Sequence, residues 1–437
     1  MKSFSTPIRF MLISSFFMSF GYFAVYAFLA IYLLTFLHFS AVQVGTVLTV
    51  MTITSRVIPL FSGLIADKIG YIIMMIAGLF LRGIGFIALG ICSDFYTISI
   101  SSALIGFGTA FYEPAARAIF GSQPAHLRKN LFTYLNLSFN CGAIIGPIAG
   151  GFLLLLDPIY AFSLTGSLML LFAFIFYLLK NHFQVTTENT SITLGIQAIL
   201  QNKSFLLFSF IMIFFYIMFT QLTVALPLHM KNISSSNQLA TLVITINAIT
   251  GVIFMVLFRK LFHKYNTLSI IKYGVLLMSI SFLLIPLFQH PYWLFICVIL
   301  FTIGETLVLP NADITIANYS NESYTATFFG FYQLSLAFGF IIGNYTGTSF
   351  TSNLSGMYTP WLIFGGIGLI GFISLHILNI KKWPLKRIYT YVIQATYNEK
   401  DSTIICDSRI FLLFIFKMIM PFTTKQIAPT YKIRFKF

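Results

Sequence analysis

Four ionisable side chains stand within long apolar stretches of this 437-residue chain. Arg56 and Arg82 each lie about eleven residues from the nearer polar end of their stretch, or roughly 16 Å along a helix. Glu113 and Glu305 lie in two further stretches. A charge at the centre of a bilayer costs at least ~2.5 kcal/mol, so each of the four is a candidate for chemistry.

The chemistry open to a buried carboxyl group is to bind and release a proton. Burial raises the pKa of such a group and a neighbouring cation lowers it. Glu305 has no cation near it along its helix and is the first candidate proton carrier, with Glu113 second. Glu113 can pair with Arg117 four residues later on one helix face, or with Arg82 on another helix. A static ion pair or a cytoplasm-facing latch is the competing interpretation for both glutamates.

The composition predicts that these residues lie in a membrane. The chain is 58% hydrophobic and 8% charged, whereas soluble domains carry roughly 25% charged residues. A membrane span needs about 20 mostly apolar residues. The sequence therefore predicts an all-α membrane protein with twelve spans, at 10–36, 42–65, 71–92, 96–119, 131–155, 159–179, 204–228, 239–258, 268–288, 291–313, 324–350 and 358–380.

Positive residues mark one side of these spans. Sixteen Lys and Arg residues fall in loops and ends on that side, and Lys231 alone falls on the other. Because Lys and Arg are enriched in cytoplasmic loops, we expect both termini in the cytoplasm and a multi-pass protein of the cell (inner or plasma) membrane. The asymmetry accounts for much of the net charge of +15, so the expected partner is the lipid bilayer and not nucleic acid.

The apolar segments show an internal duplication. Gly108 and Pro114 stand opposite Gly304 and Pro310 at a shift of 196, and three glycines within 142–150 recur at a shift of 197. Duplicated helix sets are typical of secondary transporters, whose substrate site lies between the halves. The expected parts are an N-terminal six-helix bundle (1–180), a cytoplasmic linker (181–203), a C-terminal six-helix bundle (204–380) and a cytoplasmic tail of unknown role (381–437).

The second span ends in the sequence Gly-Leu-Ile-Ala-Asp-Lys-Ile-Gly, at 63–70. This resembles the Gly-x-x-x-Asp-Arg/Lys-x-Gly signature of the major facilitator superfamily. The Asp can be held by the positive end of a neighbouring helix, and the second Gly permits a tight turn. The family pattern continues with basic residues, whereas Tyr71 and Ile72 follow here. A plain glycine turn with a capping Asp is the alternative. The resemblance implies a conformational latch, for which the candidates are Gly63, Asp67, Lys68, Gly70 and Arg117.

The fifth span carries a second pattern, Gly-x-x-x-Gly-Pro-x-x-Gly-Gly, at 142–151. It resembles the motif of the drug:proton antiporters within the superfamily. Small residues four apart let another helix pack closely, and a proline loosens the helix, so generic packing is the alternative. The chain departs from these antiporters at Ser102, where they commonly carry an Arg. The residues of this antiporter-like motif are Gly142, Gly146, Pro147, Gly150 and Gly151.

The resemblance covers about 8–380. It implies the major facilitator fold, in which twelve helices form two pseudo-symmetric six-helix bundles. Similarity to bacterial twelve-helix multidrug exporters implies proton-coupled efflux of drugs or other small amphipathic compounds by alternating access, with the protein acting as a monomer. The expected substrate-cavity residues are Tyr112, Asn136, Asn140, Gln221, Asn247 and Gln333, for each of which interhelical hydrogen bonding is the alternative role.

Two other functions remain open. A same-fold importer of a sugar, organic anion or peptide is the first, because Arg56 and Arg82 would suit an anionic substrate. A non-transporting membrane scaffold or sensor is the second. Nothing in the sequence resembles an enzyme site, since it has no Walker loop, no metal-ligand cluster and no Ser/His/Asp set on one face. We therefore expect no enzyme activity, no metal and no cofactor, with a proton gradient as the source of energy.

Overall fold

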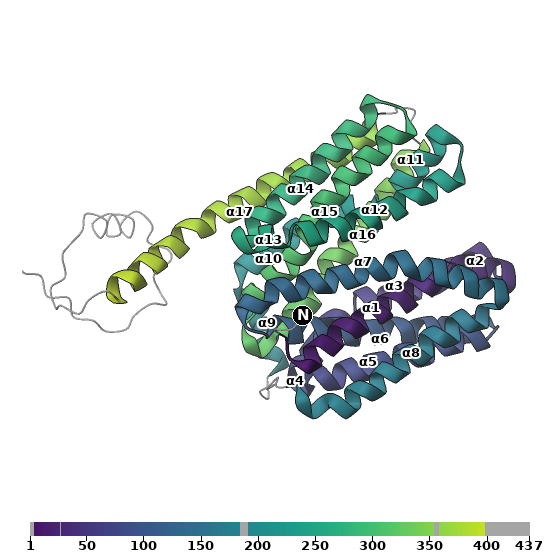
Figure 1. Cartoon of the computed structure of the whole chain (residues 1–437), viewed down its shortest axis with the longest axis horizontal. Helices are drawn as coiled ribbons and strands as arrows, with labels where there is room; N and C mark the ends of the chain where they lie inside the picture. Colours follow the sequence, from purple (N-terminus) through teal and green to yellow (C-terminus); the bar gives the residue numbers. More distant parts are fainter. Residues whose placement is uncertain (1–3, 27, 184–190, 354–357, 398–437) are drawn as a thin grey trace, which may run out of the picture. The chain divides into compact units, whose positions relative to one another are not determined.

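The structure is a computed structural model and describes residues 4–26, 28–183, 191–353 and 358–397. These residues form helices joined by short loops, and none of them forms a strand (Figure 1). Eleven helical segments are long and apolar enough to cross a membrane, or twelve when one bent pair counts as a single span. The predicted fold class, an all-α membrane protein with twelve spans in two bundles, is confirmed.

The N-terminal bundle holds the first six spans. Its helices are α1 (Thr6–Tyr26), α2 (Leu29–Ile31), the π-helical turn η1 (Tyr32–Phe36), α3 (Ala41–Arg56), α4 (Pro59–Ile69), α5 (Tyr71–Ile91), α6 (Phe95–Gly121), α7 (Ala125–Leu156), α8 (Pro158–Leu179) and the 3₁₀ turn η2 (Lys180–His182).

The C-terminal bundle follows the short helix α9 (Ile192–Gln201), which lies within 181–203. Its helices are α10 (Lys203–Thr220), α11 (Ala225–Ser234), α12 (Asn237–Leu257), α13 (Arg259–Lys264), α14 (Thr267–Leu284), the 3₁₀ turn η3 (Ile285–Leu287), α15 (Pro291–Tyr319), the 3₁₀ turn η4 (Glu322–Tyr324), α16 (Thr325–Asn353) and α17 (Thr359–Tyr397). The chain divides into two units, 1–380 and 381–437. Of the predicted tail, 398–437 lies outside the described residues.

The second span differs from its prediction because it is broken. The helix α3 ends at Arg56, α4 begins at Pro59, and the two are bent by 41°. Proline has no backbone N–H and its ring clashes with the preceding turn, so a helix ends before it and a new one can begin on it. Arg56 therefore stands in the last turn of a helix, where the helix dipole favours a cation.

Close helix crossings recur in the two bundles at a constant shift. A Cβ atom on Gly78 would lie 2.6 Å from the Gly108 carbonyl oxygen, so α5 and α6 touch backbone to backbone. A Cβ atom on Gly274 would lie 2.7 Å from the Gly304 oxygen, between α14 and α15. The shift of 196 relates both pairs. The repeated sequence therefore builds the same crossing twice, and only glycine permits it.

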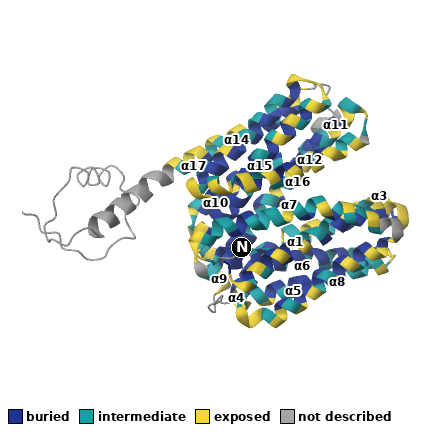
Figure 2. Cartoon of the chain, viewed as in Figure 1, coloured by how far each residue is buried: buried dark blue, intermediate teal, exposed yellow. Residues whose placement is uncertain are grey.

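Burial follows the expected pattern for helices in lipid. Buried residues gather on the helix faces that meet inside each bundle, and exposed ones lie on the outer faces (Figure 2). Large apolar side chains lie on these outer faces, as Phe80 and Ile84 do on α5. Such faces suit hydrocarbon, because lipid tails are as apolar as the side chains.

Candidate functional site

The two bundles meet along a contact surface, here called the seam, which buries the carboxylate of Asp67. This residue is in the last turn of α4 and is 1% exposed. Its Oδ1 accepts a hydrogen bond from the Ala326 amide (3.0 Å) and its Oδ2 accepts one from the Thr327 amide (2.7 Å). The Thr327 hydroxyl also donates to Oδ2. A carboxylate is stabilised at the start of a helix, here α16, by free amides and the helix dipole.

Two glycines let α4 and α16 come this close. A Cβ atom on Gly63 would lie 2.4 Å from the Ala326 carbonyl oxygen, and one on Gly330 would lie 2.1 Å from the Pro59 oxygen. Gly70 joins α4 to α5 with a φ of 114°, a conformation that favours glycine. Lys68, the remaining signature residue, is exposed.

Two ion pairs lie deeper in the seam region. Arg117 on α6 lies 3.9 Å from Asp313 on α15 and so joins the two bundles. Glu113, which the sequence places near Arg117 or Arg82, instead lies 3.8 Å from Arg56. Gln333 of α16 donates to the same carboxylate oxygen, Glu113 Oε2, at 3.1 Å. Glu113 therefore has both a cation and an amide partner in this conformation.

Arg82 is a buried cation of the N-terminal bundle. It is 6% exposed and lies over the Tyr22 ring, 5.9 Å from the centroid. Its Nε atom has no hydrogen-bond partner among the described residues, and the nearby Tyr112 hydroxyl lies beside Ser14 and Ser15. Its stem packs against Gly108, where a Cβ atom would lie 2.5 Å from Arg82 Cγ.

Glu305 lies inside the C-terminal bundle and is 6% exposed. Asn247 of α12 donates to its Oε2 at 2.6 Å, and the same amide lies 2.8 Å from the Thr302 hydroxyl. Neither ion pair found in the described part of the chain involves Glu305. The structure thus gives this carboxyl group an uncharged partner.

A second contact across the seam was not predicted. Asn130 in the first turns of α7 accepts a hydrogen bond from Arg259 Nε (3.1 Å), and His263 Nε2 lies 3.0 Å from the same oxygen. Lys129 donates to the Phe262 carbonyl oxygen. Burial, followed by the charges of Lys129 and Arg259, lowers the pKa of His263. The short helix α13 is thereby held against the other bundle.

The repeat carries a signal for this contact. At the shift of 196, His263 stands opposite Asp67 and Asn130 stands opposite Ala326. The two contacts are thus related by the internal symmetry, although their chemistry differs. Both lie near the end of the spans that carries most of the loop Lys and Arg residues, here called the basic end. The Arg117–Asp313 and Glu113–Gln333 contacts lie in the same half of the spans.

The antiporter-like glycines of α7 pack against α1 within the N-terminal bundle. Cβ atoms on Gly146 and Gly150 would lie 2.6 Å from the Phe20 oxygen and 2.0 Å from the Ala24 oxygen. Gly142 likewise meets the backbone of α1, whereas nothing lies within 4 Å of a Cβ on Gly151. Pro147 lies inside α7. The motif therefore forms a close helix–helix contact on one face.

The predicted cavity residues have different surroundings. Gln221, fully buried at the break between α10 and α11, donates to the oxygens of Ile217 (2.8 Å) and Gly343 (3.0 Å) and so joins α10 to α16. Asn136 and Asn140 donate to carbonyl oxygens of their own helix. Asn140 also faces α12, since a Cβ on Gly251 would lie 3.4 Å from its Oδ1.

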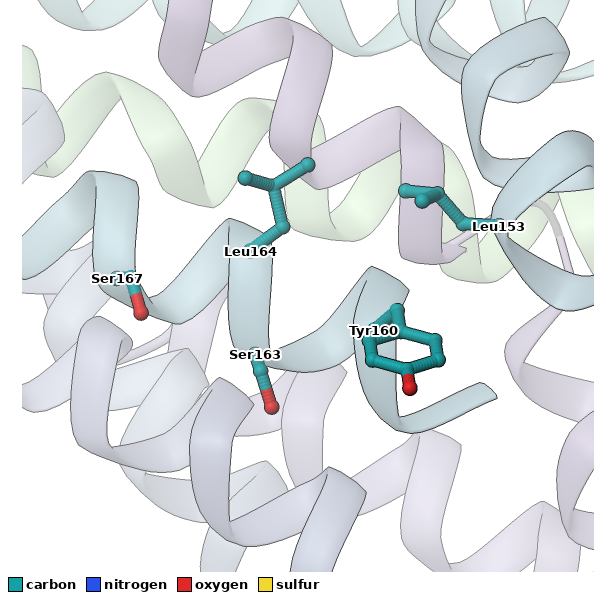
Figure 3. Close-up of a pocket in the computed structure, with 5 residues that line it drawn as sticks. All are labelled: Leu153, Tyr160, Ser163, Leu164 and Ser167. Atoms are coloured by element: carbon teal, nitrogen blue, oxygen red, sulfur yellow. The ribbon is translucent and has the colours of Figure 1, made fainter. Parts of the chain in front are cut away.

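A hollow of about 400 Å³ lies away from these charges, on α7 and α8. Figure 3 shows Tyr160, Ser163, Leu164 and Ser167 of α8 with Leu153 of α7 around it. Its lining is mostly apolar and contains no Asp, Glu, Lys, Arg or His. We place no site here, because the feature suits lipid contact.

Two duplicated helical bundles with charges buried where they meet are the architecture of a membrane transporter. A family model described as Major Facilitator Superfamily matches residues 11–344 and 209–437, and the chain belongs to this superfamily.

Curated relatives are similar in sequence, and solved structures are similar in fold. The multidrug resistance protein MdtH of Blochmanniella pennsylvanica is 27% identical over 341 residues, covering 76% of this chain and 83% of that protein. MdtH of Klebsiella pneumoniae is 25% identical over 367 residues, covering 84% and 91%. The E. coli fucose:proton symporter FucP has the same fold, with a TM-score of 0.70, 14% identity and coverage of 85% and 98%. The human organic anion transporter MFSD10 also has this fold, with a TM-score of 0.68 and 16% identity. The match covers 85% of this chain and 100% of MFSD10.

Proposed function

We propose that this transporter exports drugs or other small amphipathic compounds in exchange for protons, and that Glu305 carries the proton. The observation that supports this role is the pairing of a buried carboxyl group with Asn247 and Thr302 rather than with a cation. An amide can face both the neutral and the charged carboxyl group, since it offers a donor and an acceptor. A neutral partner therefore permits proton exchange that a tight ion pair would oppose.

The proposed cycle is alternating access between the two bundles in the cell membrane, with the basic end facing the cytoplasm. In the conformation described here the seam is held together at that end by the Asp67 and Arg117 contacts. A proton from the other side would neutralise Glu305 and weaken substrate binding. The halves would then rock, part at the basic end and release the proton to the cytoplasm. The protein is proposed to act as a monomer.

The test uses everted membrane vesicles, with ethidium as the amphipathic probe. An imposed pH gradient should drive ethidium uptake by the wild-type protein, and Glu305→Gln should abolish it while the protein remains folded. The matched control is Asp157→Asn, which alters an exposed carboxylate at the start of α8. Unchanged ethidium-induced proton flux in Glu305→Gln would reject Glu305 as the carrier.

Import of an organic anion is the second candidate, and one observation favours it. Arg82 is a buried cation whose Nε atom lacks a hydrogen-bond partner among the described residues. An anionic substrate could supply that partner. The direction of labelled-substrate flux in right-side-out vesicles separates the two candidates, because an importer would accumulate the substrate.

A further inference from the structure

We infer that Tyr71 positions the Asp67 carboxylate for its contact with α16, so that this one contact of the seam forms without a cation. This inference rests on the proposed alternating-access cycle. It assigns a role to a residue at which the chain departs from the family signature.

The position of Tyr71 follows from the turn before it. Gly70 has a φ of 114°, which starts α5 so that its first residue folds back beside the last turn of α4. Tyr71 is 3% exposed, and its hydroxyl donates to Asp67 Oδ1 at 2.8 Å. The Ala326 amide donates to the same oxygen from the other bundle.

The donors to Asp67 are therefore of two kinds. Three come from α16 and are lost when the bundles part, namely the Ala326 amide and the amide and hydroxyl of Thr327. The fourth comes from Tyr71, in the same bundle as Asp67, and in this conformation the Tyr71 hydroxyl also lies beside Thr325 and the Ala326 backbone of α16. No ion pair of Asp67 exists among the described residues, and Lys68 beside it is exposed.

This arrangement gives Tyr71 a specific task. When α16 has separated from α4, the Tyr71 hydroxyl holds the Asp67 carboxylate in the orientation that the α16 amides bind. The carboxylate therefore needs less reorientation when the bundles close. A cation at this position would bind the carboxylate in both states and compete with the amides. A neutral donor leaves the charge free to be captured by the start of α16.

The test measures the ratio of the two access states by spin-label distances. Labels on His126→Cys and Lys260→Cys, both exposed and on opposite bundles at the basic end, report whether the seam is closed. Tyr71→Phe keeps the buried ring and removes only the hydroxyl. The closed-to-open ratio should fall about tenfold, which corresponds to about 1.4 kcal/mol. Tyr324→Phe, a tyrosine at the same end, is the matched control and should leave the ratio unchanged.

A double-mutant cycle with Asp67→Asn decides whether Tyr71 acts through Asp67. Tyr71→Phe should have little further effect once Asp67 is Asn, in the distance ratio and in thermal unfolding of the same four proteins. Additive effects in both measurements, or a Tyr71→Phe protein that matches wild type, would overturn the inference. If every protein gave a single label distance at every pH, alternating access would be refuted instead. The double-mutant cycle measured by thermal unfolding would still test whether Tyr71 acts through Asp67.

Discussion

Adding one methyl group at the seam should shift the access equilibrium without unfolding either bundle. In Gly63→Ala the new Cβ atom would lie 2.4 Å from the Ala326 oxygen, and in Gly330→Ala it would lie 2.1 Å from the Pro59 oxygen. Ordinary contacts begin at 3.4 Å, so α4 and α16 must separate by about 1 Å in either variant. Both contacting atoms belong to the backbone and cannot rotate away.

The size of the effect follows from this geometry. Overpacking costs about 1–3 kcal/mol, and the same separation stretches the Asp67 hydrogen bonds beyond their useful length. The cost is confined to the closed state, because the seam opens in the other state. The closed-to-open ratio should therefore fall by about 5- to 150-fold.

The assay is the distance between labels on the two bundles at the basic end, with thermal unfolding measured in parallel. Gly45→Ala is the matched control, since nothing lies within 4 Å of a Cβ there. We expect both seam variants to populate the longer distance and Gly45→Ala to match wild type. If the seam variants kept the wild-type ratio, or if Gly45→Ala shifted it equally, the seam would not be the closing surface.

Three further predictions concern other contacts. Gly150→Ala should destabilise the N-terminal bundle by about 2 kcal/mol, because its Cβ would meet the Ala24 oxygen at 2.0 Å, whereas Gly151→Ala should be neutral in the same thermal unfolding measurement. Lowering the pH below about 6.5 should loosen the contact between α13 and α7, because the closed state lowers the pKa of His263 and so disfavours its protonated form. The label distance should therefore depend on pH, and His263→Gln should remove that dependence. Asp313→Asn should weaken the seam by about 2 kcal/mol, because it leaves the Arg117 charge without its partner. The cost is below that of a fully buried pair because the Arg117 side chain is 27% exposed. Adding Arg117→Gln to the Asp313→Asn protein should restore most of the label-distance ratio.

The glycine spacing of the antiporter-like motif predicts a helix contact but not the partner helix. Its spacing predicts a close helix contact, and Gly142, Gly146 and Gly150 do meet α1. Spacing could not say which helix they meet. The same holds for Gln221, whose polar side chain suggests a substrate contact but whose amide joins α10 to α16 in this conformation.

The sequence by itself determined the membrane class, the number of spans and the duplication, because hydropathy, charge asymmetry and glycine spacing are properties of contiguous segments. Only the tertiary structure decided that Glu113 lies by Arg56, that Arg117 lies by Asp313 and that His263 faces Asn130. These pairs depend on which helices are neighbours and how each is rotated. Residues four apart on a helix can always meet, whereas residues on different helices, 57 to 196 positions apart in these pairs, meet only if the packing of the helices brings them together.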